Sequence, residues 1–230
     1  MPQLSELEIE ALRLSLRVAC WSVAGSLPFG LLAAWLLARR RFPGKVLLDA
    51  LVHLPLVVPP VVIGYALLLL FGRNGPVGAW LYDTFGITVA FTWQGAALAS
   101  AVMAFPLMVR AMRLSLEAVD RKLEAAARTL GAAPADVFFT VTLPLMAPGI
   151  LAGAVLAFAR SLGEFGATIT FVSNIPGETR TLPIAIYSLT QTPGGEAAAL
   201  RLAILSVLLA LAALLASELL ARGIQARLRG

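Results

Sequence analysis

The feature that most constrains this chain is a series of apolar runs, each long enough to cross a lipid bilayer. A helix needs about 20 mostly apolar residues to span the hydrocarbon core. Only 13% of the residues are charged, against about 25% in a typical soluble domain. The pattern predicts an all-α polytopic membrane protein that forms a single transmembrane domain over residues 1–230. The five runs cover residues 12–37, 46–71, 87–108, a stretch within 141–172, and 197–220.

Basic residues cluster after the first, third and fifth runs, which places all three clusters on one side of a five-span protein. Because cytoplasmic loops are enriched in Lys and Arg, we expect this side to be cytoplasmic. The N-terminus is then outside and the C-terminus inside. The net charge is +5, but the basic residues lie at the edges of the apolar runs, where they determine topology. We therefore expect no nucleic-acid partner. The clusters are residues 39–45, then Arg110, Arg113, Arg121, Lys122 and Arg128, and finally Arg222, Arg227 and Arg229.

A further apolar run, residues 182–189, is too short to cross a bilayer and ends before Pro193. We interpret it as a short periplasmic or re-entrant segment. A six-span protein is the alternative, but it would place the C-terminal basic cluster on the opposite side of the membrane.

Prolines interrupt the second run, where Pro59 and Pro60 follow Pro55. Proline removes a backbone donor and kinks a helix. In a membrane such kinks face other helices or a water-lined cavity, because lipid cannot satisfy free backbone groups. For this cluster, simple packing and a functional role remain equally open.

The fourth run contains two opposite charges, Arg160 and Glu164. They are four residues apart, so a helix would place them on one face. Charges at membrane depth are costly and usually face the protein interior or a watery cavity. A mutually neutralising structural pair is the favoured interpretation, and a role in a polar pathway or gate is the alternative.

The loop between the third and fourth runs predicts a short amphipathic helix. Its apolar residues Leu123, Ala126, Ala127 and Leu130 have the spacing of one helix face. Lys122, Glu124 and Arg128 lie opposite, and Glu124 and Arg128 have the spacing of an i, i+4 ion pair. Gly131 suits the left-handed position that ends a helix, and Pro134 suits the first turn of the next one.

A short helix with an apolar face needs a surface to cover that face. From the residues alone, two surfaces remain equally open: the lipid interface and a groove in a partner protein. The narrow, alanine-rich face suits close docking in a protein groove better than insertion into lipid.

The same segment resembles the EAA loop of ABC-importer permeases. That pattern reads E-A-A, three residues, G, nine residues, I-x-L-P. Here nine residues separate Gly131 from Val141-Thr142-Leu143-Pro144. One departure from the pattern matters, since Ala125 occupies the glutamate position and Glu124 precedes it. Segments 53–65, 159–168, 171–181 and 191–196 resemble the permeases of molybdate importers and, in part, those of sulfate and tungstate.

This resemblance implies the fold and role of a channel-forming subunit of a type I ABC importer in the bacterial inner membrane. Its partners would be two copies of an ATPase subunit, a second copy of the permease, most simply as a homodimer, and a periplasmic molybdate-binding protein. Within a cytoplasmic coupling loop at 120–144, docking would rest mainly on Ala126, Ala127 and Leu130, with Glu124 and Arg128 peripheral. The full candidate coupling set is Glu124, Ala126, Ala127, Arg128, Leu130, Gly131, Pro134, Leu143 and Pro144. The candidate pathway or gate set is Pro59, Pro60, Arg160, Glu164, Phe165 and Thr168.

The sequence carries no phosphate-binding Gly-x-x-x-x-Gly-Lys-Ser/Thr motif. We therefore expect a pore subunit without enzymatic activity or cofactor, with ATP hydrolysed by a partner chain. With one histidine, His53, and one cysteine, Cys20, a His-based metal site is excluded and an intramembrane enzyme is disfavoured. An ATP-independent secondary transporter is the remaining alternative, but the chain shows no internal repeat of the kind such proteins often contain.

Overall fold

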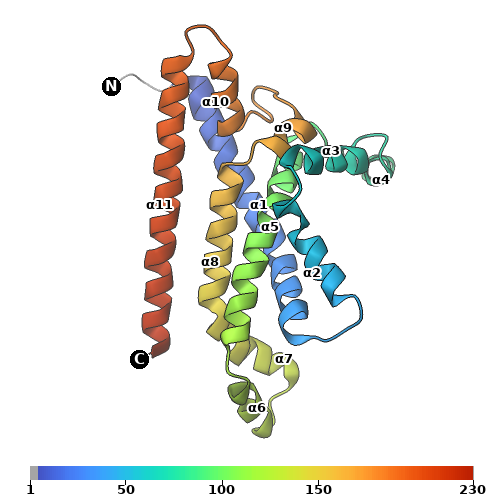
Figure 1. Cartoon of the computed structure of the whole chain (residues 1–230), viewed down its shortest axis with the longest axis vertical. Helices are drawn as coiled ribbons and strands as arrows, with labels where there is room; N and C mark the ends of the chain where they lie inside the picture. The colour runs from blue at the N-terminus through green and yellow to red at the C-terminus, as the bar shows by residue number, and fades with distance from the viewer. Residues whose placement is uncertain (1–4, 230) are drawn as a thin grey trace.

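The computed structural model describes residues 5–229, which contain helices and no strand. Four long helices follow the long axis of the molecule (Figure 1). They are α1 (Glu6–Arg39), α5 (Trp93–Ala118), α8 (Leu143–Leu162) and α11 (Glu196–Arg229). The all-α prediction holds throughout the described part of the chain. For residues 217, 218 and 220–229 only the backbone is described, so the side chains of the predicted C-terminal cluster, Arg222, Arg227 and Arg229, lie outside the description.

The first predicted span forms α1, which starts at a capping box. The Ser5 hydroxyl accepts from the Glu8 backbone N–H, and the Glu8 carboxylate accepts from the Ser5 N–H at 2.7 Å. This reciprocal cap satisfies two donors that would otherwise lack partners. The helix continues past Pro28 to Arg39 without interruption.

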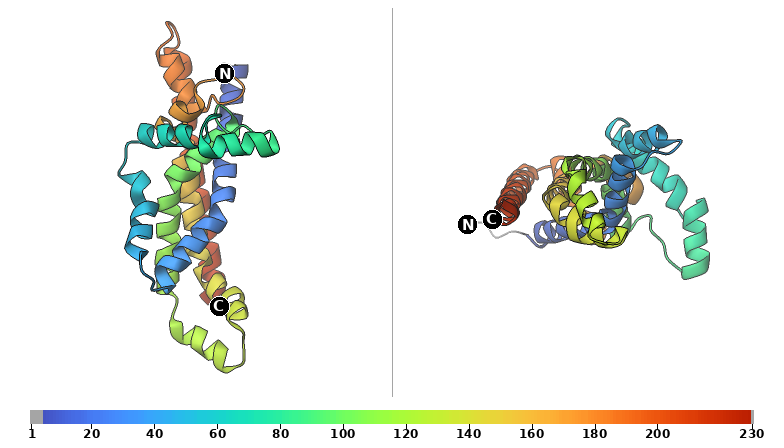
Figure 2. Two further views of the ribbon diagram at one scale, coloured as in Figure 1. Left: turned by 90° about the vertical axis from the view of Figure 1, so that its right-hand side faces the viewer. Right: turned by 90° about the horizontal axis from the view of Figure 1, so that it is seen from below.

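The second predicted span is interrupted at its prolines, as the sequence indicated, but the break is much sharper than a kink in one continuous helix. It consists of α2 (Lys45–His53), a short 3-10 turn η1 (Leu54–Leu56) and α3 (Pro60–Phe71), with a bend of 112° between the two parts. Pro55, Pro59 and Pro60 withhold backbone donors at the break, which explains why the helix cannot continue straight. Figure 2 shows α3 lying across the bundle instead of along it.

The connection that follows α3 contains a further helix, α4 (Pro76–Phe85), where the sequence suggested only a loop. Pro76 occupies its first turn, and Gly86 ends it in the left-handed conformation at φ 68°. This helix extends away from the bundle at the same level as α3 (Figure 2).

The third span begins and ends later than predicted. Thr92 caps α5, its hydroxyl accepting from Gly95 N–H at 3.2 Å, and the helix continues to Ala118. Arg110 and Arg113 are therefore part of this helix and not of a loop. Arg113 contacts Asp49 of α2 at 3.2 Å, so it ties two helices together.

The fourth predicted span is divided. Helix α6 (Arg121–Thr129) precedes the predicted stretch, and α7 (Pro134–Val137) and the π-helical turn η2 (Phe138–Thr142) lead into α8, which forms most of it. After α8 ends, a separate short helix α9 (Gly166–Val172) follows. The predicted short run near 182–189 is confirmed as α10 (Leu182–Thr190), a nine-residue helix too short to cross a bilayer.

Helix α5 forms the centre of the bundle and packs between α1 and α8. Gly149 and Gly153 of α8 allow close approach, because a Cβ at Gly153 would lie 3.0 Å from the Met108 carbonyl oxygen. Met108, Met112 and Leu116 of α5 are fully buried in the core near the base of the bundle. This packed core supports the segment that leads into α6.

The described ends of the chain lie at opposite ends of the molecule (Figure 1). The turn after Arg39 and the helix α6 lie at the same end as the end of α11, whereas α10 lies at the other. Among the described residues, four helices are long and apolar enough to cross a membrane, or five if the bent pair α2–α3 counts as one span. The side of the membrane on which each end lies stays a prediction.

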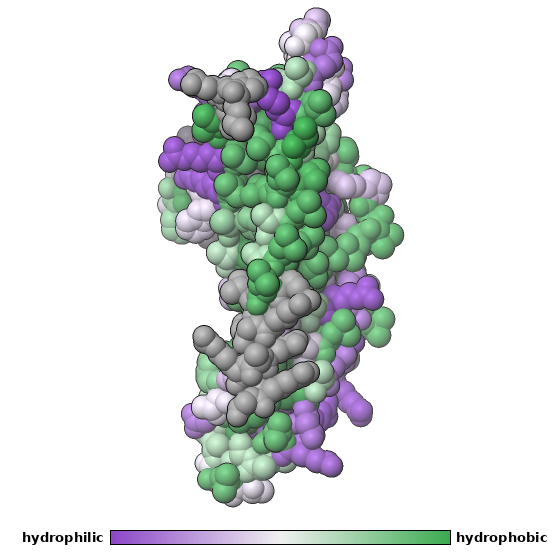
Figure 3. Space-filling model, turned by 90° about the vertical axis from the view of Figure 1, so that its left-hand side faces the viewer, coloured by the Kyte–Doolittle hydropathy of each residue, from purple (hydrophilic) through white to green (hydrophobic). Residues whose placement is uncertain are grey.

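Where its side chains are described, the outer surface of α11 is largely apolar (Figure 3). Leu200, Val207 and Leu211 are each at least half exposed. Such a band would be unfavourable in water and is the surface expected of a helix facing lipid.

Candidate functional site

Helix α6 forms the tip of the molecule, and local chemistry defines both of its ends. The Asp120 carboxylate accepts from Lys122 N–H at 2.9 Å and caps its start. At its other end Gly131 has φ +90°, and Ala132 N–H donates to the Ala127 carbonyl at 3.2 Å. Pro134 occupies the first turn of α7. The predicted sequence of short helix, sharp turn and new helix is confirmed.

The apolar face of α6 is largely uncovered. Leu130 is 89% exposed and Leu123 is 49% exposed. Ala126 is exposed and Ala127 is half-buried, and α6 as a whole contains no buried residue. An apolar face at the tip of a helical hairpin, only partly covered by the described part of the chain, has the form of a docking element.

Glu124 does not pair with Arg128, contrary to the sequence prediction. Its Oε1 accepts from Arg39 Nη2 at 2.9 Å and from the Thr142 hydroxyl at 2.8 Å. Both partners come from other elements, the end of α1 and the end of η2. Arg128 is exposed and has no carboxylate within 4.0 Å among the described residues. Glu124 therefore links the base of α6 to α1 and η2, and its predicted peripheral role in docking stays a prediction.

The turn η2 joins this base to α8. It is a single π-helical turn of five residues, and Leu143 and Pro144 follow it directly as the first turn of α8. Single π turns inserted between helices occur frequently at functional sites. Leu143 is half-buried and Pro144 is exposed. The coupling candidates thus surround one continuous helical connection from α6 into the bundle.

The second group of candidates lies at the far end of α8. Arg160 is in the last turn of α8, but Glu164 follows the end of the helix, so the predicted shared helix face does not exist. The two side chains still meet, with Arg160 Nη1 2.7 Å from Glu164 Oε2. That oxygen makes no aligned hydrogen bond in the described structure, so we regard the contact as an ion pair held by charge.

Glu164 is buried and caps α9. Its Oε1 accepts from Ala167 N–H at 2.9 Å, and only 2% of the residue is exposed. Thr168 is also buried, and its hydroxyl donates to the Phe165 carbonyl at 2.9 Å. Both side chains are thus enclosed by the described part of the chain. Their geometry favours the structural interpretation of the charged pair.

Helix α3 packs against α9 at this end of the molecule. A Cβ at Gly64 would lie 2.5 Å from the Ala167 carbonyl oxygen, and a Cβ at Gly166 would lie 2.8 Å from Pro60. Phe165 packs against Tyr187 of α10, with ring centroids 5.2 Å apart. Pro59, next to Pro60 in the chain, is exposed. The structure thus brings Pro60, Phe165 and Glu164 into one region.

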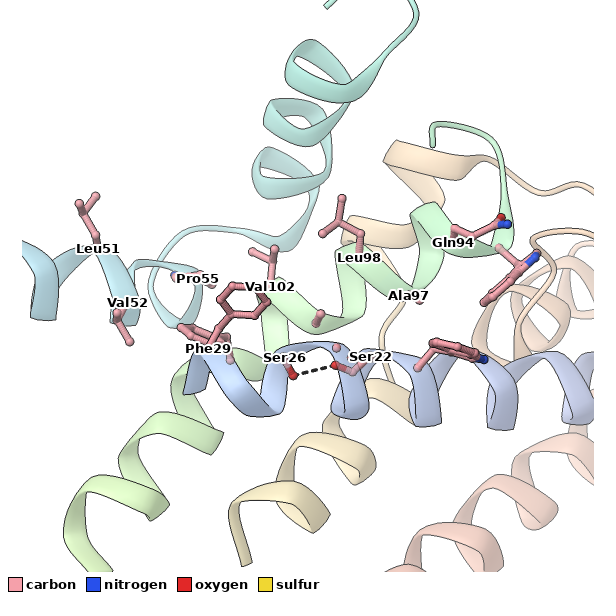
Figure 4. A pocket seen from close by; sticks show the side chains of 15 residues that line it. Ser22, Ser26, Phe29, Leu51, Val52, Pro55, Gln94, Ala97, Leu98 and Val102 are labelled. Carbon is pink, nitrogen blue, oxygen red and sulfur yellow. Dashed lines mark hydrogen bonds between the residues drawn. The ribbon is translucent and has the colours of Figure 1, made fainter. Parts of the chain in front are cut away.

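Two features of the structure were missed by sequence reasoning. The first is the role of Arg39 and Thr142 as partners of Glu124, for which separations of 85 and 18 residues leave no local signal. The second is an apolar hollow of about 720 Å³ between α1, η1 and α5 (Figure 4). Phe29, Pro55 and Val102 line it, and the Ser26 hydroxyl beside it donates to the Ser22 carbonyl at 2.7 Å.

In the described part of the chain, four membrane-length helices, a bent helix pair and an exposed helical hairpin at one end define an integral membrane protein. Residues 26–226 match the family described as "Binding-protein-dependent transport system inner membrane component". The chain belongs to this family. Together with its apolar helices, this membership makes it a multi-pass protein of the inner membrane.

Individual relatives are similar over nearly their whole length. The molybdenum transport system permease protein ModB of Escherichia coli (strain K12) is 66% identical over 95% of this chain and 96% of its own. The ModB of Haemophilus influenzae is 60% identical over 96% and 97%. The fold matches a bacterial ABC transporter involved in the import of alginate, with a TM-score of 0.75, 20% identity, and coverage of 96% of this chain and 80% of that one. The predicted type I ABC importer permease fold is thereby confirmed.

Proposed function

We propose that this chain is the channel-forming permease subunit of an ATP-driven molybdate importer. The observation that carries the proposal is the exposed apolar face of α6, held on a base that connects to α1 and α8. The substrate is inferred from the relatives at 66% and 60% identity, whose names specify molybdenum transport. Tungstate and sulfate are the alternative substrates of the same transporter class.

The partners follow from the architecture. The pore would form between two copies of the chain, and two copies of an ATPase subunit would receive the α6 hairpins on the cytoplasmic side. A periplasmic binding protein would deliver molybdate at the opposite end, where α9 and α10 lie. A structural neighbour was determined together with a periplasmic protein, which supports this type of partner.

Coupling would work as a two-state mechanism. Nucleotide binding to the ATPase subunits would shift α6, and the Glu124 link to Arg39 and Thr142 would pass that shift to α1 and α8. A ligand shifts such an equilibrium only through its different affinity for the two states. The α6 hairpin must therefore stay docked in both states, which suits an apolar contact that needs no precise charge alignment.

At the other end, Arg160 and Glu164 would neutralise each other where α8 gives way to α9. The pair would hold the α8–α9 junction in one of the two states. A weakly attractive pore suits an importer, because a tightly bound dianion would leave it slowly.

The proposal is tested by Leu130→Asp. Leu130 is 89% exposed, so the variant is expected to fold and insert normally. It should lose co-purification of the ATPase subunit and ATP-dependent molybdate uptake in proteoliposomes. Lys122→Gln on the same helix is the matched control and should retain both. Normal uptake by Leu130→Asp would refute docking through α6.

The substrate is tested separately by competition. Uptake of labelled molybdate by cells that depend on this chain should be reduced far more by unlabelled molybdate than by sulfate at equal concentration. Stronger competition by tungstate or sulfate would assign the importer to that anion instead.

A further inference from the structure

A cavity of about 1130 Å³ lies between the basic end of α1 and the α6–α7–η2 hairpin. Its lining has two chemically distinct parts. One part is apolar and includes Leu31, Leu32 and Phe139, whereas the other contains four arginines and one carboxylate. The proposed coupling mechanism uses the Glu124 link to Arg39 and Thr142 in the wall of this cavity, but it assigns no role to the other three arginines or to the apolar part.

The two parts of the lining are ordered along α1. Pro28, Leu32, Trp35 and Arg39 line the cavity at spacings of four, three and four residues, which place them on one helix face. The stripe is apolar at Pro28 and cationic at Arg39. At 1.5 Å per residue it extends about 16 Å, close to half of the roughly 30 Å hydrocarbon core. Polarity thus changes over the depth of one leaflet.

The cationic part has an excess of positive charge. Glu124 is already paired with Arg39 at 2.9 Å. Arg40, Arg121 and Arg128 have no carboxylate within 4.0 Å among the described residues. The Arg40 guanidinium lies 4.7 Å from the centroid of the Trp35 ring, so it is held at the mouth of the cavity. Arginine forks bind phosphate oxygens in a bidentate manner.

The apolar part is open at its surface. Leu32 is 54% exposed and Phe139 is 64% exposed. A free oxyanion would use only the arginines and would leave these side chains uncovered. A molecule with an anionic head and hydrocarbon chains would cover both parts in the observed order.

We propose that this cavity binds an anionic glycerophospholipid of the leaflet on the basic side of the protein. The phosphate lies among Arg40, Arg121 and Arg128, and the acyl chains lie along Leu32 and Phe139. Basic pockets between membrane helices on the cytoplasmic side are known to hold anionic headgroups. Such a lipid would connect α1 to the α6–α7 hairpin independently of any ATPase contact, so the inference does not depend on the proposed function.

The test uses the full chain purified with its ATPase subunit. Native mass spectrometry follows retention of dioleoylphosphatidylglycerol and of dioleoylphosphatidylcholine. The wild type should retain the anionic lipid in preference to the zwitterionic one. In the double variant Arg40→Gln/Arg121→Gln, affinity for phosphatidylglycerol should fall by a factor on the order of 10 to 30, the loss expected for two cationic contacts. Lys122→Gln removes the same charge from α6 outside the cavity lining and should change little.

A second variant separates a lipid from a free anion. Leu32→Asn changes only the apolar wall and should also weaken retention of phosphatidylglycerol, whereas inorganic phosphate should not displace the lipid from the wild type. Equal retention of both lipids, unchanged affinity in the double variant, or displacement by phosphate would overturn the proposal. So would loss of the ATPase subunit from the double variant with lipid retention intact, since the arginines would then serve the protein partner.

Discussion

Glu124 joins three segments that are distant in the chain, because one of its oxygens accepts from both Arg39 and Thr142. The side chains of Arg39 and Glu124 are only 12% and 16% exposed, so water screens this ion pair less than a surface pair. The position of the α6 hairpin therefore depends on a single carboxylate.

Removing that carboxylate should loosen the hairpin. We expect Glu124→Ala to lower the free energy of unfolding by about 2 kcal/mol, the range for hydrogen bonds to charged groups, and to reduce uptake. In a double-mutant cycle with Arg39→Ala, a coupling of roughly 1 kcal/mol is expected. Arg128→Ala, at an exposed position without an ion-pair partner in the described structure, should stay within about 0.5 kcal/mol of wild type. Additive effects of the Glu124 and Arg39 changes would contradict the link.

Gly131 is a second residue on which the hairpin depends. Its φ of +90° is a conformation in which a side chain is strained by roughly 1–2 kcal/mol. Gly131→Ala should therefore lower thermal stability and reorient α6, with partial loss of uptake. Gly163→Ala is the comparison, since Gly163 has φ −94° and should tolerate the methyl group. Equal stability of the two variants would argue against a required left-handed turn.

At the scale of elements, α3 and α9 pack closely because glycine occupies a contact position on each helix. Both Gly64 and Gly166 lie where a Cβ would collide with the opposite helix. The two helices belong to the two segments that depart most from straight spans, the bent pair and the divided fourth span. A contact between two broken segments offers a natural place for movement during transport.

This contact predicts the effect of a single methyl group. Gly64→Ala should push α3 away from Ala167 and reduce uptake more than it reduces membrane insertion. Gly25→Ala in α1, where nothing lies within 4 Å of the added atom, should behave as wild type. The readouts are molybdate uptake and the amount of protein in the membrane fraction, and a fully active Gly64→Ala would exclude a tight α3–α9 contact.

Across the whole molecule, the distribution of charge and the positions of the two chain ends agree. The turn after Arg39 and the α6 hairpin, both rich in arginine, lie at the end opposite the start of α1 (Figure 1). The positive-inside rule then predicts that the hairpin lies in the cytoplasm. Docking of an ATPase requires this assignment.

The orientation can be measured directly because the chain has one cysteine. In a Cys20→Ser background, Ser5→Cys should react with a membrane-impermeant thiol reagent in intact spheroplasts. Thr129→Cys, on the exposed end of α6, should react only after the membrane is opened. The reverse pattern would invert the topology and remove the basis for coupling.

Much of this protein could be predicted without a structure, because the relevant signals are local. Apolar length defined the long helices, and the spacing of Leu123 and Leu130, with Gly131 and Pro134 after them, defined α6 and its turn. These patterns report on neighbours within a few residues, so hydrophobicity and backbone preference are sufficient to read them. Prolines likewise indicated an interruption in the second span, but not its size.

Tertiary packing decided the rest. The 112° bend of α2–α3, the end of α8 before Glu164, and the choice of Arg39 over Arg128 as the partner of Glu124 all depend on groups brought together from distant parts of the chain. A carboxylate on a helix has several partners within reach, and the one it selects is the one that the fold buries beside it. Spacing along the sequence shows which side chains a residue can contact. The free energy of each contact depends on its burial, and burial is established only when the helices pack.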